Sequence, residues 1–347
     1  MKKILNYING ELIEPKSNSY IDNFEPAKGE VYSLIPDSDE NDVELALQAA
    51  EEAFPTWSKT PKEERSAILK KIADLIEENL DTLAEAESRD NGKPLALAKK
   101  VDIPRASHNF SFYSSAIIHF ESESHDMEIG AINYTLRQPI GVAACISPWN
   151  LPLYLFSWKI APAIAAGNCV IAKPSEITPM TAFLLSDICI KAGLPKGVLN
   201  IVHGYGHKVG AALTAHPKIP VISFTGGTQT GESIAKVAAP MFKKLSLELG
   251  GKNPTIIFDD CDYDKMLNTT IRSAFANQGQ ICLCGSRIYV QKGIYDKFKK
   301  DFVEKVSQLK VGNPNDKSTD QGALVSKAHM EKVLSYIQLA KDEGGKI

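Results

Sequence analysis

The sequence predicts an α/β protein built around a doubly wound parallel sheet. Four continuous apolar runs follow Ile140, and each is followed by a segment long enough for a helix. Strands become apolar on both faces when helices cover both sides of a parallel sheet. Repeated strand–helix units of this kind place ligands beyond the carboxyl ends of the strands. The four runs are 140–146, 169–172, 198–202 and 221–224.

The segments before this sheet have different patterns. The Asn9-Gly10 pair between two short apolar runs predicts a hairpin. Apolar residues at helical spacing predict two amphipathic helices, at about 43–54 and 61–83. Residues 131–138 alternate apolar and polar side chains, which predicts a half-exposed strand.

A second, smaller α/β unit is predicted from Gly250 onward. We therefore divide the chain into a nucleotide-binding domain, 1–249, with an interface strand region at about 120–139, and the N-terminal part of a catalytic domain, 250–347. After Gly344-Gly345 the chain resembles the entry to a further strand, so this second domain is expected to be incomplete. Its predicted elements are strands 255–258 and 287–291 and helices at 263–277, 294–309 and 326–342.

Composition excludes several classes of function. The net charge is −3 and 44% of the residues are hydrophobic, which is typical of a core-forming protein with no nucleic-acid or membrane-surface partner. The N-terminus has no apolar run typical of a signal peptide and no stretch is apolar enough to span a bilayer, so we expect a cytoplasmic protein. The six scattered cysteines form no disulfide framework and no metal-ligand spacing.

Cys282 is the first candidate catalytic residue. It follows Asn277-Gln-Gly279, a polar, glycine-broken loop after a predicted helix. A reactive cysteine needs a partly exposed setting that favours the thiolate, and loop backbone donors can provide one. The alternative is a buried cysteine that acts as a small hydrophobic residue, which is our interpretation of Cys284.

Glu248 is the second candidate. It lies in an otherwise apolar strand and precedes Leu249 and the Gly250-Gly251 pair. A carboxylate there needs a partner or has a raised pKa, and a raised pKa suits a general base. The alternative is a structural salt bridge, for example with Lys252.

Asn150 is the third candidate, in Ser147-Pro-Trp-Asn150-Leu-Pro152 at the end of the first buried strand. Its amide can donate to an oxyanion. The alternative is an Asx turn.

Two further stretches indicate a nucleotide site. Lys173-Pro-Ser-Glu176 follows the second strand, and Phe224-Thr-Gly226-Gly-Thr-Gln-Thr-Gly231 follows the fourth and begins a helix. A helix N-terminus with small residues binds anions. The absence of a Gly-Lys-Ser/Thr ending excludes a P-loop.

Together, and in this order, these stretches closely resemble the aldehyde dehydrogenase superfamily over the whole chain. The runs Ala86–Ala98, Ile103-Pro-Arg105, Pro152-Leu-Tyr-Leu and Gln280-Ile-Cys-Leu-Cys284 resemble its 2-aminomuconate and 2-hydroxymuconate semialdehyde dehydrogenase branch. The resemblance implies NAD as cofactor, an aldehyde substrate such as a carboxylated semialdehyde, and homodimers or homotetramers.

The resemblance also implies roles for individual residues. Cys282 would attack the aldehyde, the Asn150 amide and the Cys282 N–H would stabilise the oxyanion, hydride transfer to nicotinamide would give a thioester, and Glu248 would activate the water that hydrolyses it. Glu176 would bind the adenosine ribose and disfavour NADP. The matching cofactor-binding positions are Trp149, Lys173, Glu176, Gly206, Thr225, Gly226, Gly227, Gly231 and Leu249.

Two residues match the family's substrate-binding positions. Arg105 would bind a substrate carboxylate and Trp158 would line the substrate tunnel; the alternatives are a surface arginine and a core tryptophan.

The sequence also departs from the family pattern. Many relatives have serine where Gly227 stands, and no Glu-Ile-Phe-Gly-Pro segment follows. This leaves a second hypothesis, a fragment that binds NAD weakly without turnover. A CoA-acylating relative is a third, although such branches often lack a glutamate at the position of Glu248.

Overall fold

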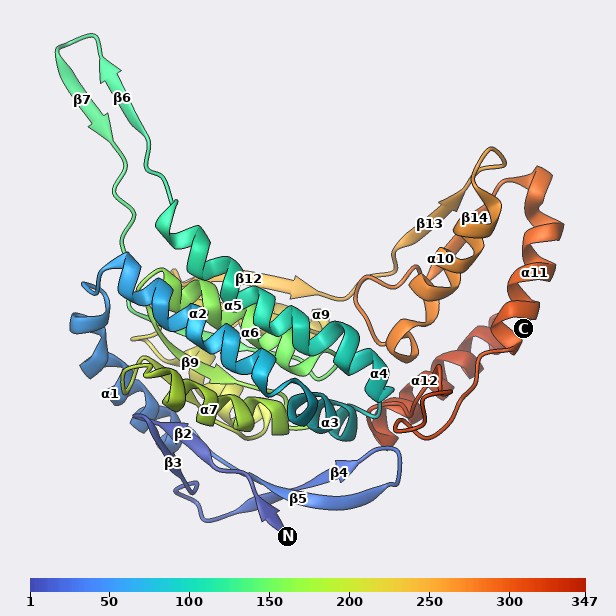
Figure 1. Ribbon diagram of the computed structural model, residues 1–347, viewed down its shortest axis with the longest axis horizontal. Helices are drawn as coiled ribbons and strands as arrows, with labels where there is room; N and C mark the ends of the chain where they lie inside the picture. Colours follow the sequence, from blue (N-terminus) through green and yellow to red (C-terminus); the bar gives the residue numbers. More distant parts are fainter.

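The computed structural model describes all residues, 1–347, and has a seven-stranded central sheet between layers of helices (Figure 1). The strand order is β12-β11-β8-β9-β10-β2-β3, in which the first five strands are parallel and β2 and β3 are antiparallel. The strands of this sheet are β2 (Asn6–Ile8), β3 (Glu11–Ile13), β8 (Val142–Ile146), β9 (Cys169–Lys173), β10 (Leu199–Ile201), β11 (Val221–Gly226) and β12 (Lys244–Leu249).

The parallel strands run outward from β8 in both directions, to β9 and β10 on one side and to β11 and β12 on the other. This is the doubly wound arrangement, and it confirms the predicted fold class. The direction of winding reverses between β8 and β11, the switch point at which open α/β sheets bind ligands. The helices of these units are α6 (Pro152–Ala165), α7 (Met180–Ala192), α8 (Ala211–Ala215) and α9 (Thr228–Ala238).

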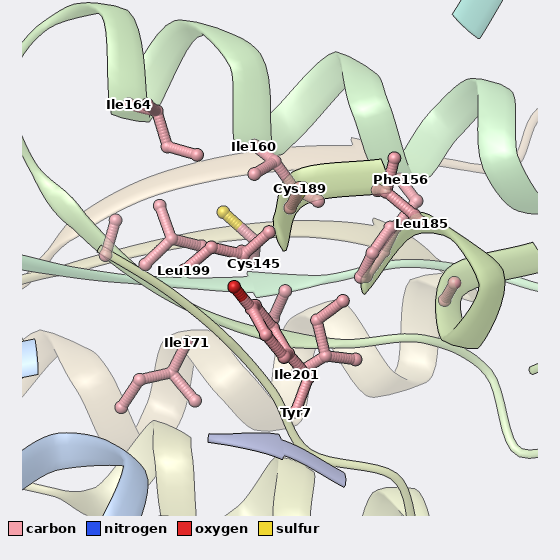
Figure 2. Packing of buried hydrophobic residues seen from close by; sticks show 14 of the residues in the cluster. Tyr7, Cys145, Phe156, Ile160, Ile164, Ile171, Leu185, Cys189, Leu199 and Ile201 are labelled. Carbon is pink, nitrogen blue, oxygen red and sulfur yellow. The ribbon is translucent and has the colours of Figure 1, made fainter. Parts of the chain in front are cut away.

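The core lies against β8 and β9, every residue of which is buried. Figure 2 shows Ile160 and Ile164 of α6 directed toward the sheet that carries Cys145 and Leu199. The predicted continuous apolar strands are therefore confirmed for these two strands.

The N-terminal region supplies the two strands at one edge of the central sheet. The predicted hairpin is β2–β3, with Asn9 and Gly10 both at positive φ, as a tight two-residue turn requires. A separate three-stranded sheet has the order β1-β5-β4. The other elements here are β1 (Lys2–Lys3), β4 (Tyr20–Glu25), β5 (Glu30–Pro36), α1 (Glu40–Trp57), α2 (Lys62–Glu78), α3 (Leu80–Asn91), α4 (Leu95–Leu97), a π-helical turn (Ala98–Asp102) and α5 (Ile103–Ile118).

The prediction of a half-exposed strand over 131–138 is wrong in two respects. The strand β7 is only Ala131–Tyr134, and all four of its residues are exposed, as are those of its partner β6 (Ser124–Met127). The two form a hairpin that projects away from the rest of the chain (Figure 1), so neither face of β7 is covered.

The remaining elements form a smaller unit around the parallel pair β13–β14, beside the first sheet (Figure 1). The central sheet ends with β12, and β13 begins the separate two-stranded sheet. The division of the chain into two domains at 249/250 stays a prediction. Residues 345–347 form no strand. None of the helices is both long and apolar enough to cross a membrane. The elements are β13 (Pro254–Ile257), α10 (Tyr263–Phe275), a 3-10 turn (Ala276–Gly279), β14 (Arg287–Val290), α11 (Tyr295–Ser307) and α12 (Lys327–Asp342).

Candidate active site

The two strands at the switch point bring two of the predicted stretches to one edge of the sheet. The loop with Trp149 and Asn150 follows β8, and Gly226-Gly227 follows β11, the neighbouring parallel strand. Because parallel strands end on the same side, both stretches lie at the carboxyl edge where a ligand can bind.

Lys173 and Glu176 form an ion pair at the end of β9, with 3.0 Å between Nζ and Oε2. Burial raises the pKa of Glu176, but the Lys173 ammonium and the backbone N–H groups of Glu176 and Gly206 outweigh it and hold that pKa below its usual value. The structure thus brings together three predicted cofactor-binding residues, Lys173, Glu176 and Gly206. The Glu176 carboxylate among them is charged at neutral pH.

The turn after β11 has the close packing that small residues allow. A Cβ at Gly231, in the first turns of α9, would lie 2.6 Å from the Leu249 side chain, so the glycine lets α9 approach β12. Gly227 has open space around its Cα and no side chain caps α9. The first N–H groups of α9 are therefore available to an anion.

Trp149 is held by contacts on both its backbone and its ring. Its carbonyl accepts from Asn91 Nδ2 at 3.0 Å, and its indole lies 4.7 Å from the ring of His329 in α12. Residues far apart in the sequence therefore fix this loop.

Asn150 is fixed to the loop that carries Cys282. Its Nδ2 donates to the Gln280 carbonyl at 2.9 Å. A primary amide has two N–H groups, so one remains for another acceptor. Cys282 is half-buried, and its own backbone N–H has no acceptor in the protein. The structure therefore places two free donors, one on Asn150 and one at Cys282, on adjoining segments.

The Cys282 loop has an unusual backbone. Asn277 and Gln278 are consecutive non-glycine residues at positive φ, 52° and 57°. Such residues cost about 1–3 kcal/mol each and persist only where the surroundings impose them. Here Asn277 Nδ2 donates to the Asn150 carbonyl at 2.9 Å, and Gln278 Nε2 donates to the Ala323 carbonyl at 2.6 Å.

Glu248 differs from the sequence prediction. β12 is the edge strand of the sheet and alternates in exposure, so Glu248 is exposed on a half-covered strand instead of lying in an apolar one. It has no hydrogen bond or ion pair, and the predicted alternative of a salt bridge to Lys252 is wrong, since Lys252 Nζ donates to the Gly251 carbonyl. No hydrogen bond joins Glu248 to Cys282, which belongs to the smaller unit.

Arg105 and Trp158 lie on adjacent helices, α5 and α6, and border one cavity of about 290 Å³. Arg105 donates to the Tyr154 hydroxyl at 3.1 Å, and the Tyr154 and Trp158 rings meet edge to face at 5.7 Å. Arg105 is exposed and has no ion pair, which leaves its guanidinium available to a carboxylate. Trp158 is 44% exposed, so the alternative of a core tryptophan is wrong.

The sequence interpretation missed several polar residues around this site. Lys93 donates to the Asn150 carbonyl, Gln280 lies buried between Asn277 and Val325, and Lys159 donates to the Thr225 hydroxyl. Burial lowers the pKa of Lys159, whereas the charge of nearby Glu248 opposes that change. A lysine in an otherwise apolar helix was the signal that could have identified Lys159.

Comparison with known proteins fixes the family. A model described as the aldehyde dehydrogenase family matches residues 12–347. The chain belongs to the aldehyde dehydrogenase family. It is therefore related to oxidoreductases that act on aldehydes.

Individual family members are similar over nearly the whole chain. The 2-aminomuconic semialdehyde dehydrogenase of Bos taurus is 54% identical, over 99% of this chain and 70% of its own length. The 2-hydroxymuconic semialdehyde dehydrogenase of Pseudomonas sp. strain CF600 is 44% identical, over all of this chain and 73% of its own length. An NAD⁺ complex of an aldehyde dehydrogenase from Bacillus cereus superimposes with a TM-score of 0.97 at 36% identity, over 99% of this chain and 70% of that one.

Proposed function

We propose that this aldehyde dehydrogenase family chain oxidises an aldehyde to a carboxylic acid with NAD, through Cys282. The observation that carries the proposal is the 2.9 Å hydrogen bond from Asn150 Nδ2 to the Gln280 carbonyl. It joins the segment after β8 in the central sheet to the loop that carries Cys282, whose side chain is half-buried.

The chemistry follows from the residues present. The Cys282 thiolate attacks the aldehyde carbon, and the carbonyl oxygen becomes an oxyanion. The free N–H of Asn150 and the Cys282 backbone N–H donate to that oxyanion. Oxyanion-hole donors of this type contribute about 2.7–4 kcal/mol each to transition-state stabilisation.

After oxidation the acyl group remains on Cys282 as a thioester, which water hydrolyses. Glu248 is our proposed base for that water. Its exposure leaves the side chain free to move, and Lys159 provides a positive charge close to it. Hydrolysis releases the acid and regenerates the thiol. The Glu248 carboxylate also distinguishes this proposal from the CoA-acylating alternative.

The residues at the carboxyl edge fit NAD. Glu176 presents a charged carboxylate that can accept from both ribose hydroxyls, and the first N–H groups of α9 can bind a phosphate. When bound, NAD would accept the hydride from the substrate. Lys173, Gly206, Thr225, Gly226, Gly227, Gly231, Leu249 and Trp149 are the other proposed contacts or supports of that site.

We propose a carboxylated semialdehyde as the substrate. The relatives named as 2-aminomuconic and 2-hydroxymuconic semialdehyde dehydrogenases support this class. Arg105 supports it independently, because its guanidinium lies unpaired beside a cavity with an exposed aromatic residue, Trp158. An arginine fork binds a carboxylate in two parallel hydrogen bonds.

We also propose that the β6–β7 hairpin contacts another subunit in a homodimer or homotetramer. Ile129, Ile132, Tyr134 and Leu136 are all more than half exposed on it or directly after it. Apolar groups gathered on one exposed hairpin are typical of an interaction surface.

The test is NADH formation at 340 nm from 2-hydroxymuconic semialdehyde, with Cys282→Ser as the variant and Cys284→Ser as the control. Cys282→Ser should lower kcat at least about a thousandfold, whereas Cys284→Ser should remain within a few-fold of the parent. Binding of NAD without NADH formation by the parent would support the non-catalytic alternative. A thioester of CoA in place of the free acid would support the CoA-acylating one.

A further inference from the structure

We propose that Lys93 is a positioning residue that sets the orientation of Asn150 and, through it, of the Cys282 loop. This inference rests on the proposed function, because it explains how the oxyanion donor of that reaction is held. Lys93 makes no hydrogen bond to Cys282 or to the Asn150 side chain, so its action is indirect.

Lys93 is an unusual residue in the interior. It is 0% exposed, and its Nζ lies 2.7 Å from Asp102 Oδ2 and 3.7 Å from Glu87 Oε1. The third neighbour is the Asn150 carbonyl oxygen, at 3.2 Å. Lys93 thus donates one hydrogen bond to the Asp102 carboxylate and one to the backbone carbonyl of Asn150, with the Glu87 carboxylate nearby.

The partners of Lys93 come from three different elements. Glu87 lies in α3, Asp102 ends the π-helical turn before α5, and Asn150 follows β8. The other carboxylate oxygen of Glu87 accepts from the Leu153 N–H at 3.3 Å, in the first turn of α6. The cluster therefore holds both ends of the short segment that contains Asn150.

Two further donors reach the same carbonyl, and the longer of these hydrogen bonds comes from Asn91 Nδ2 at 3.4 Å. Asn277 Nδ2 lies 2.9 Å from the Asn150 oxygen, and Asn150 Nδ2 in turn donates to the Gln280 carbonyl. Lys93, Asn150 and the 277–280 turn therefore form one chain of hydrogen bonds. Lys93 is the only charged donor to this carbonyl, and its loss would leave two amide donors and weaken both bonds to the turn.

If Lys93 only stabilised the fold, a variant that regains stability would also regain activity. Buried ion pairs can often be replaced by apolar residues of similar size with little loss of stability, whereas removing one partner is costly. Burial raises the pKa of Glu87 and of Asp102, and the charge of Lys93 opposes it in both. Replacing Lys93 together with Asp102 leaves only Glu87, whose raised pKa favours the neutral form, and should thus restore most of the stability but not the hydrogen bond to Asn150.

The experiment compares Lys93→Met, the double variant Lys93→Met/Asp102→Leu, and Lys243→Met in the full chain. Lys243 is a matched control, since it is also buried and its Nζ donates to two backbone carbonyls, of Thr214 at 2.7 Å and His216 at 2.6 Å, away from Cys282. We measure kcat and KM, the melting temperature, and amide hydrogen exchange of peptides covering residues 276–286.

In the double variant we expect a near-parental melting temperature, a kcat lowered about tenfold to hundredfold, an unchanged KM for NAD, and faster exchange over 276–286. Lys243→Met should lose stability but keep kcat and the exchange rate of that segment. A double variant with parental kcat and parental exchange would overturn the proposal, even if Lys93→Met fails to fold. Absence of turnover in the parent would instead count against the proposed function, because the exchange measurement needs no activity.

Discussion

The two sides of the candidate site are held in place by different forces. On the cofactor side, β8 and β9 are buried at every residue, and Lys173 at the end of β9 is itself only 2% exposed. On the catalytic side, β12 and β14 alternate in exposure, and the Cys282 loop is held by side-chain amides. Packing therefore positions the strands from which the proposed NAD-binding residues extend, whereas directed hydrogen bonds position Asn150 and the Cys282 loop.

This difference predicts that substitutions on the cofactor side have the largest effects on stability. Ile171→Ala in β9, where the side chain is fully buried, should lower the free energy of unfolding by about 2–5 kcal/mol. Ile256→Ala in β13, where the side chain is 63% exposed, should change it by less than about 0.5 kcal/mol. Urea unfolding monitored by circular dichroism measures both. Equal losses would show that the two sides are packed alike.

The next largest effect is on kcat and comes from a substitution on the catalytic side. Asn150→Ala removes the proposed oxyanion donor and its bond to Gln280, and should lower kcat about 10²- to 10³-fold. Because the side chain is not part of the NAD site proposed here, the KM for NAD should stay within a few-fold. Steady-state NADH formation measures both constants. A rise in the KM for NAD with an unchanged kcat would indicate that Asn150 binds the cofactor and does not stabilise the oxyanion.

Arg105 tests the substrate class and should have a smaller effect. Arg105→Ala should raise KM for a carboxylated semialdehyde about tenfold to hundredfold, since hydrogen bonds to charged groups contribute about 1.5–3 kcal/mol. An uncharged aldehyde serves as the control and should be little affected. Equal losses for both substrates would contradict carboxylate recognition by Arg105.

The smallest effect concerns pH and the cofactor side. The pKa of Glu176 is held below its usual value, so its charged form stabilises the fold above the ordinary carboxyl pKa of about 4.3 and loses this effect as the pH falls through the folded value. Glu176→Gln should therefore cost at most about 1 kcal/mol at pH 7, and less as the pH approaches 4. Unfolding of both proteins at several pH values tests this. If the stability cost of Glu176→Gln instead grew as the pH fell, the charged form of Glu176 would not be the one that stabilises the fold.

The cofactor side was largely predictable from the sequence because its signals are local. Continuous apolar runs predicted β8 and β9, and the Asn9-Gly10 turn predicted β2–β3. In the same way, Lys173 and Glu176 are three residues apart, so their pairing needs only the turn between them. The order of the stretches then indicated the family, which the comparisons confirm.

The catalytic side was less predictable because its contacts join distant residues. Lys93 and Asn150 are 57 positions apart, and Asn150 and Gln280 are 130 apart. No local pattern encodes such pairs. The exposure of Glu248 was also missed, since its strand is apolar enough to suggest burial but lies at the edge of the sheet.

The central claim, that Cys282 carries the acyl group and Glu248 promotes its hydrolysis, has a direct test. The Glu248→Gln variant is mixed with NAD and 2-hydroxymuconic semialdehyde, quenched in acid, digested and analysed by mass spectrometry. We predict that the peptide containing Cys282 gains the mass of the acyl group, and that the Cys284→Ser form of the same variant gains it as well. Turnover without that adduct, or an acyl group on another residue, would contradict the account.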